Sequence, residues 1–98
     1  LDIRVATVDS VEDHPNADRL YVLNLTVGGE KRVICSSIKD FYTKEELTGK
    51  QILLLANLKP TKLRGVLSQG MLLAAEDKDG NLSLATTMEE LKSGAQLS

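Results

Sequence analysis

The segment Leu20-Tyr21-Val22-Leu23-Asn24-Leu25-Thr26-Val27, followed by Gly28-Gly29, decides the fold class of this chain. Its apolar side chains recur at every second position from Tyr21 to Val27, which is the period of a half-buried β-strand. The two glycines tolerate positive φ and predict a hairpin turn, and Arg32-Val33-Ile34-Cys35 supplies the returning strand. The sequence therefore predicts an antiparallel hairpin near its N-terminal third.

Further strands are predicted on both sides of this hairpin. Residues 3–11 alternate apolar and polar side chains with one slip, which is typical of a strand that contains a bulge. Residues 52–56 form a continuous apolar run that is too short for a typical helix, so we interpret them as a buried strand. Residues 71–75 predict a fifth strand. Asp79-Gly80-Asn81 predicts a second hairpin turn, which leads into a short strand at 82–84.

Helix signals are few and short. Thr43 and Glu46 have the spacing of a capping box, and the helix that they begin is predicted to end at Gly49. Residues 87–91 repeat the same pattern before Gly94, which predicts a second short helix.

The expected order is three strands, a short helix, two strands and a small extension. This is the order of the oligonucleotide/oligosaccharide-binding (OB) barrel. We therefore predict an all-β, five-stranded OB-fold barrel with a short helix between strands 3 and 4. Residues 1–98 would be one domain, with residues 76–98 as a C-terminal extension; a small β-sandwich is the competing fold. Because a strand begins at once without an initiator methionine, we expect a trimmed or excised domain.

Charge is distributed unevenly along an acidic chain. The formal net charge is −2, yet no Asp or Glu occurs from Leu47 to Ala75. Within that stretch, a loop with Pro and Gly carries the cations Lys59, Lys62 and Arg64. A local cationic surface on an acidic protein indicates that a polyanion binds at one place. An exposed loop whose charges are merely solvated is the alternative interpretation.

Residues just after these cations, and the scarcity of aromatic residues, refine this interpretation. Ser68 and Gln69 can donate hydrogen bonds to phosphate or ribose, and Met71 is either a core residue or an apolar contact for a sugar or base. The chain has two Tyr, one Phe and no Trp. Proteins that hold single strands usually stack bases on several aromatic rings. Phosphate contacts and shape should therefore dominate, as in the recognition of folded RNA.

No motif in the chain indicates catalysis, a metal or a membrane span. A metal site would need His14, the only histidine, together with Cys35 and distant acids, and no ligand spacing supports one. Gly65 to Gly70 lacks the Gly-Lys-Ser/Thr of a P-loop. The single Cys35 lies in an apolar strand and indicates a small buried residue in a reducing compartment. No apolar run approaches the length of a membrane-spanning helix. We expect no enzymatic activity and no cofactor for this domain itself.

Several blocks, in the right order, resemble one known family. They are Asp2-Ile3-Arg4-Val5, His14-Pro15-Asn16-Ala17-Asp18-Arg19-Leu20-Tyr21, the helix before Gly49-Lys50, Asn57-Leu58-Lys59-Pro60-Thr61-Lys62-Leu63-Arg64-Gly65 and Ser68-Gln69-Gly70-Met71-Leu72-Leu73-Ala74-Ala75. Together they resemble the tRNA-binding OB domain at the C-terminus of methionyl-tRNA synthetases. The same domain occurs in stand-alone structure-specific tRNA-binding proteins and in the endothelial monocyte-activating polypeptide II group. The resemblance spans residues 1–97; Ala6 and Ser37 replace glycines that are usual in the family.

The resemblance implies a non-catalytic, cytoplasmic domain that binds folded tRNA by shape and phosphate contacts. It would be the C-terminal domain or beta subunit of a methionyl-tRNA synthetase and would raise the tRNA affinity of its catalytic partner. The alternatives are a homodimerisation module with incidental RNA binding and a free-standing tRNA-binding chaperone. By motif position, together with the cationic loop, the predicted tRNA-binding residues are Arg19, Asn57, Lys59, Lys62, Arg64, Ser68 and Met71.

The resemblance to bacterial members also implies a symmetric homodimer. The extension from Glu76 to Leu97 carries more apolar residues than five strands need. We therefore predict that part of it, including Leu82 and Leu84, forms the dimer interface together with the first strand. The alternative is that these residues only plug the end of the barrel.

Overall fold

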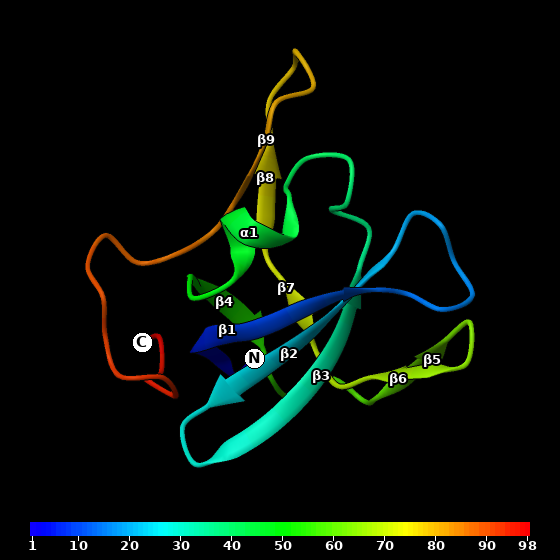
Figure 1. Ribbon diagram of the computed structural model, residues 1–98. Coiled ribbons are helices and arrows are strands. Elements are labelled where there is room, and N and C mark those ends of the chain that lie inside the picture. Colours follow the sequence, from blue (N-terminus) through cyan, green and yellow to red (C-terminus); the bar gives the residue numbers. More distant parts are fainter.

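The computed structural model describes residues 1–98 and consists mostly of β-strands (Figure 1). The elements in chain order are β1 (Ile3–Asp13), β2 (Tyr21–Val27), β3 (Glu30–Ser36), α1 (Lys44–Leu47), β4 (Gln51–Leu55), β5 (Thr61–Leu63), β6 (Val66–Ser68), β7 (Met71–Leu72), β8 (Ala74–Glu76) and β9 (Leu82–Leu84). A five-stranded antiparallel sheet has the order β3-β2-β1-β4-β7, and two small hairpins, β5-β6 and β8-β9, extend from it. The sheet curls into a half-barrel consistent with an OB-like fold, and α1 lies between the third and fourth strands. These features confirm the all-β prediction.

β1 is the strand that makes the sheet curl. Its first half pairs with β4, from Ile3 opposite Leu55 to Thr7 opposite Gln51. Its second half pairs with β2, and the register shifts between Val8 and Ser10, which confirms the predicted bulge. A bulge bends a strand and increases its twist, so one strand can belong to both sides of the half-barrel.

The core lies inside the curl of the sheet. Residues of β2 are alternately buried and half-buried, as its sequence predicts. Buried side chains of β3, β4 and α1 close over them, with Ile34, Ile52 and Leu47 almost fully buried. Thr43 and Glu46 form the predicted capping box of α1, which lets this single turn place Leu47 in the core. No helix is long and apolar enough to cross a membrane.

Cys35 is a buried, unpaired thiol in β3, as the sequence predicts. Burial raises the pKa of this thiol, because an apolar environment disfavours the thiolate. A raised pKa reduces the fraction of reactive thiolate at neutral pH, so the residue is suited to packing rather than to nucleophilic chemistry.

Ser68 and Gln69 meet the free edge of β3 with one backbone bond and two side-chain bonds, and no regular strand pairs there. The backbone N–H of Gln69 donates to the carbonyl of Val33 at 2.7 Å, and the Gln69 side-chain oxygen accepts from the N–H of Val33 at 2.9 Å. The Ser68 hydroxyl accepts from the N–H of Cys35 at 2.9 Å. These bonds satisfy backbone donors that would otherwise be left on an open edge.

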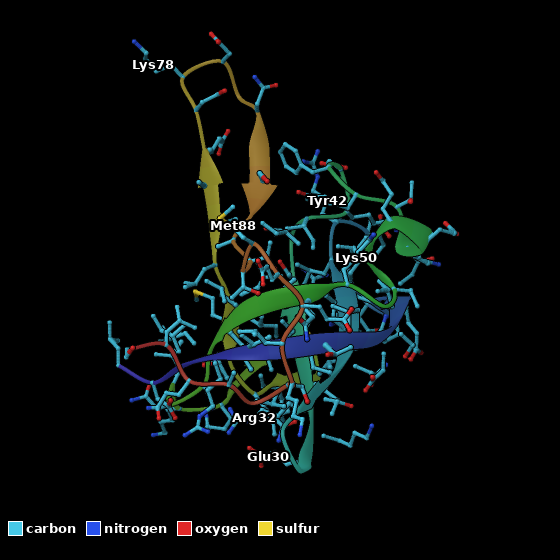
Figure 2. The ribbon with its side chains drawn as sticks, turned by 90° about the vertical axis from the view of Figure 1, so that its left-hand side faces the viewer. Glu30, Arg32, Tyr42, Lys50, Lys78 and Met88 are labelled. Atoms are coloured by element: carbon cyan, nitrogen blue, oxygen red, sulfur yellow. The ribbon has the colours of Figure 1, made fainter.

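Gly70 and Arg32 also help to close the half-barrel beside β3. Gly70 has a φ of +138°, and a Cβ there would lie 3.0 Å from both a Leu54 side-chain carbon and the Leu55 carbonyl, so the chain turns from β6 into β7 only with glycine. The Arg32 guanidinium donates to the carbonyls of Ala56 and Gln69. Figure 2 shows Arg32 and Glu30 at the end of the molecule opposite the projecting β8-β9 hairpin.

The predicted helix at residues 87–91 is wrong: this segment has no helix and forms part of an extended strap. The Thr87 hydroxyl donates to the Glu89 carbonyl instead of capping a helix. The backbone of Leu91 is held at both its N–H and its carbonyl by the side-chain amide of Gln51. A single helical turn has an unfavourable nucleation free energy, so these tertiary bonds to β4 decide the conformation.

The predicted fifth strand and the predicted loop also differ in detail. Residues 71–75 divide into β7 and β8 because the backbone of Leu73 bonds to Leu53 on one side and to Ala85 on the other. The chain thus changes partners from β4 to β9 at this residue. The segment predicted as a loop after β4 contains the β5-β6 hairpin. The predicted turn before 82–84 is confirmed, and Asp77 accepts the backbone N–H groups of Asp79 and Asn81 there.

The C-terminal strap covers the outer edge of β1. Val5 exchanges backbone hydrogen bonds with Gly94 and Ala95, and Leu97 donates to the carbonyl of Ile3. The strap passes so close to the β2-β3 turn that a Cβ on Gly94 would lie 2.7 Å from the Cα of Gly28. Gly94 also has a φ of +91°, so both its conformation and its surroundings require glycine.

We therefore expect Gly94→Ala to destabilise the protein more than Gly80→Ala. Gly80 has a similar φ of +83°, but a Cβ there would meet nothing within 4 Å, so its substitution costs only the left-handed conformation, about 1–2 kcal/mol. Gly94→Ala adds an overpacking cost of about 1–3 kcal/mol. Urea denaturation of both variants measures the difference. Equal losses of stability would show that the strap shifts away from the added Cβ of residue 94 at no cost in free energy.

Candidate nucleic-acid interface

The β5-β6 hairpin projects from the half-barrel and carries the cationic segment predicted from sequence (Figure 1). Leu63 pairs with Val66 across a two-residue turn, in which Arg64 has a φ of +51° and Gly65 a φ of +93°. Two successive positive φ values are typical of a type I′ turn, which matches the twist of a hairpin. All residues from Asn57 to Gly65 are exposed. The hairpin thus presents its side chains to solvent.

Three cations lie within residues 57–68, which we call the cationic hairpin: Lys59 is just before β5, Lys62 is in β5 and Arg64 is in the turn. None of the three has an acidic partner. Of the 12 Lys and Arg residues in the chain, half form ion pairs. The unpaired ones are Lys50, Lys59, Lys62, Arg64, Lys78 and Lys92. Three of these six lie on one hairpin. Unpaired charges are available to a polyanion without first breaking a protein ion pair, and they fit the phosphate-contact chemistry of RNA.

Arg19 lies in the β1-β2 loop and is highly exposed. Its guanidinium is 3.8 Å from the carboxylate of Asp40, whose side chain is also mostly exposed. An exposed pair at this distance is weak, so Arg19 can exchange Asp40 for a phosphate at little cost.

Lys39 and Lys44 are two further cations that the sequence interpretation did not single out. Both lie on the chain around α1 and pair with Asp13 at 3.1 and 3.0 Å. Hydrogen bonds from Lys44 and then Lys39 lower the pKa of the Asp13 carboxyl. The sequence has acidic residues beside both lysines, so no local pattern marks them as a cationic site.

Ser68, Asn57 and Met71 lie around the base of the hairpin. Ser68 is buried, and its hydroxyl accepts from Cys35 and donates to the Gly70 carbonyl, so its bonding capacity is used within the protein. The Asn57 side-chain oxygen accepts from the backbone N–H of Asp2. Met71 is 56% exposed on β7. The prediction that these residues contact tRNA stays a prediction, and the first two have structural partners that the sequence did not reveal.

The loop between β1 and β2 lies against the tip of the hairpin (Figure 1). His14 and Asn16 of this loop bond to the carbonyls of Leu63 and Arg64, at 2.8 and 3.1 Å. The sequence predicted only a turn at this place. The contact joins residues about fifty positions apart, so no local pattern could reveal it.

An exposed cationic hairpin on a curled β-sheet is the arrangement of a nucleic-acid-binding domain, and comparison with known proteins gives the family. The family described as "Putative tRNA binding domain" matches residues 3–96. The chain belongs to this family, as the sequence resemblance indicated.

Relatives and solved structures agree with this assignment. The methionine–tRNA ligase of Methanocaldococcus jannaschii is 47% identical over 97 residues, which are 99% of this chain and 15% of that protein. A methionyl-tRNA synthetase-related protein of Pyrococcus horikoshii has a structure with a TM-score of 0.90 and 38% identity, covering 99% of this chain and 89% of the other. The chaperone CsaA of Bacillus anthracis has a TM-score of 0.88 and 27% identity, covering 100% and 90%. The chain thus spans a small part of the ligase but nearly all of the two smaller proteins.

We expect Ser68→Ala to destabilise the fold by about 1–3 kcal/mol, because the buried N–H of Cys35 loses its acceptor. Ser83→Ala is the matched control, since Ser83 is exposed on β9. Chemical denaturation measures both. An unchanged denaturation midpoint for Ser68→Ala would mean that the contact between Ser68 and the edge of β3 does not stabilise the fold. Measuring tRNA binding where Ser68→Ala remains folded tests its predicted RNA contact separately.

Proposed function

We propose that this chain is a non-catalytic domain that binds folded tRNA through phosphate contacts made by the β5-β6 hairpin. The observation that carries the proposal is the set of three unpaired, exposed cations, Lys59, Lys62 and Arg64, on a projecting hairpin. Membership of the tRNA-binding-domain family supports tRNA as the polyanion. Arg19, Asn57, Ser68 and Met71 complete the proposed binding surface.

The proposed mode of recognition is shape rather than base sequence. Reading splayed bases requires aromatic platforms, and the chain has only three aromatic side chains. Tyr21 is buried, and its hydroxyl donates to the backbone of Tyr42. Phe41 is the one large aromatic residue with substantial exposure. One ring cannot read a sequence, so contacts to the RNA backbone must supply most of the affinity.

We further propose that the domain serves a methionyl-tRNA synthetase by raising its affinity for tRNA. The similarity to methionine–tRNA ligases over nearly the whole chain supports this partner. A cytoplasmic location follows from the same proposal. The alternative is a free-standing tRNA-binding chaperone, which the likeness to CsaA supports, because the match covers 90% of that protein.

A charge-reversal experiment tests the cationic hairpin. Changing Lys59, Lys62 and Arg64 to Glu should weaken tRNA binding by several kcal/mol at low salt and flatten its salt dependence by roughly one unit of slope per lost contact. The matched control changes the other unpaired cations, Lys50, Lys78 and Lys92, which alters the net charge equally. Filter binding across a salt series measures both.

Equal losses in the two triple variants would show that overall charge, and not the hairpin, determines binding. Competition of wild-type protein with poly(U) tests shape recognition in the same assay. Several folded tRNAs should bind with affinities within about tenfold of one another, and an unstructured strand should compete poorly. Equal competition by poly(U) would refute recognition by shape.

We also propose a homodimer that presents two cationic hairpins to one RNA, with Leu82 and Leu84 and the first strand at its interface. Both leucines are half-buried and pack against the core, so only part of each side chain is available to a partner. The extension adds Met88 (labelled in Figure 2), which is fully exposed, and the partly exposed Leu91 and Leu97. The alternative is a dimerisation module with incidental RNA binding.

Replacing Leu82 and Leu84 with Lys should give monomers that bind tRNA more weakly, because one RNA could then reach only one hairpin. Ser83→Lys is the control on the same strand, at an exposed position between the two leucines. Light scattering measures the mass, and circular dichroism verifies the fold. A wild-type monomer at micromolar concentration that binds tRNA tightly would refute the dimer. A dimer that ignores tRNA would favour the dimerisation module.

A further inference from the structure

The cationic hairpin has almost nothing to hold its outer part in place. Residues 57–65 are all exposed, so burial of apolar surface contributes little to their order. The ladder between β5 and β6 is internal to the hairpin. The bonds of Ser68 and Gln69 to the edge of β3 fix only the base of the hairpin. An exposed two-stranded hairpin is marginally stable on its own, so the position of its tip needs a separate explanation.

Two side chains of the β1-β2 loop supply the tertiary hydrogen bonds to the outer hairpin. His14 Nε2 lies 2.8 Å from the carbonyl oxygen of Leu63, and the Asn16 amide nitrogen donates to the carbonyl of Arg64 at 3.1 Å. Apart from the β5-β6 ladder, which reaches the Thr61–Ser68 pair, no other hydrogen bond joins residues 58–67 to the rest of the chain. One accepting carbonyl belongs to Leu63, just before the positive-φ turn, and the other belongs to the cation Arg64, the first residue of that turn.

The bonding of His14 fixes its tautomer. Its Nδ1 accepts the backbone N–H of Asn16 at 2.9 Å, so the ring proton is on Nε2, which donates to Leu63. His14 is 6% exposed, and it is one of only two buried polar residues in the chain. Nδ1 thus holds the ring within the β1-β2 loop, and Nε2 connects that loop to the hairpin tip.

We propose that His14 and Asn16 are positioning residues. The His14 ring and the Asn16 side-chain amide hold the tip of the cationic hairpin in its binding geometry and do not themselves contact the RNA. The inference rests on the proposed function, because it takes the hairpin to be the phosphate-binding element. A tip that is ordered before binding loses less conformational entropy when RNA binds, so the same cations give a higher affinity. The positioning residues contribute no charge of their own to the phosphate contacts.

Two substitutions at His14 separate the two bonds of its ring. In His14→Gln, the side-chain nitrogen reaches the position of Nε2 and keeps the bond to Leu63. In His14→Asn, the shorter side chain reaches only the position of Nδ1 and keeps the bond to Asn16. If the hairpin tether matters, His14→Gln should bind tRNA within about twofold of wild type, and His14→Asn should bind about fivefold more weakly.

Asn16→Ala removes the second tether at an exposed position, so it keeps the test valid if the buried His14 variants fail to fold. It should weaken tRNA binding by about fivefold. Asn24→Ala is the matched control: Asn24 is also a surface asparagine that donates through its amide, but to Ser10 and Glu12 on β1. It should bind tRNA as wild type does.

Amide hydrogen exchange of Leu63 and Val66, which pair across the turn, is measured by NMR on the free protein and gives a readout that a general loss of stability would not reproduce. Exchange at the tip should accelerate in His14→Asn and Asn16→Ala, but not in His14→Gln or Asn24→Ala, while core amides of β2 keep their protection. A loosened tip with unchanged tRNA affinity would overturn the proposal. Weaker binding with an ordered tip would overturn it too, because these residues would then act by contact.

Failure of the proposed function is distinguishable from failure of this inference. If wild-type protein does not bind tRNA, the proposed function is refuted and the claimed effect on affinity is refuted with it. The exchange measurement requires no RNA, so it still decides whether His14 and Asn16 order the hairpin. Similar exchange at the tip in His14→Gln and His14→Asn would refute that part.

Discussion

The closure of the half-barrel at the edge of β3 is the interaction on which the rest of the structure depends. The curled five-stranded sheet has two edge strands, β3 and β7, and unpaired backbone groups at the edge of β3 would be costly when buried. Ser68 and Gln69 meet that edge with one backbone bond and two side-chain acceptors. Because the same two residues end the β5-β6 hairpin, closing the sheet also fixes where the hairpin leaves it.

Cations on the sheet and on α1 differ from cations on the hairpin in whether they form ion pairs. Cations that emerge from the sheet and from α1 have carboxylates close by, as Lys31 has Asp9 and Lys39 and Lys44 have Asp13. The cations of the hairpin form no ion pair with any acidic side chain. On a protein with a net charge of −2, three unpaired cations close together in the chain give a local attraction for phosphate, which favours one orientation of a bound RNA.

Sequence patterns correctly predicted the elements that local periodicity determines. They failed where hydrogen bonds from distant residues override the local conformational preference. The period-two strands, the bulge in β1, the capping box at Thr43 and the cationic segment all follow from neighbouring residues. The false helix at residues 87–91 had a local capping pattern too, but Gln51 of β4 holds Leu91 in an extended strap.

The same limit applies to the candidate site. Its cations could be read directly, because they lie together in the chain. Ser68 and Gln69 were interpreted as donors to RNA, whereas the structure shows both accepting hydrogen bonds from β3, some thirty-five positions earlier. The tether from His14 and Asn16 spans nearly fifty positions. Only the folded arrangement brings these groups together.

The strap along β1 has a consequence for how the chain behaves when incomplete. Ile3 and Val5 lie between β4 on one side and residues 94–97 on the other, so β1 has no free edge there. Synthesis reaches the strap only after the rest of residues 1–98. Until then, the backbone groups of β1 at this edge are open to any extended segment, including the strap of another copy. Exchange of straps between chains is therefore the characteristic misassembly of this architecture, favoured at high concentration during synthesis or refolding.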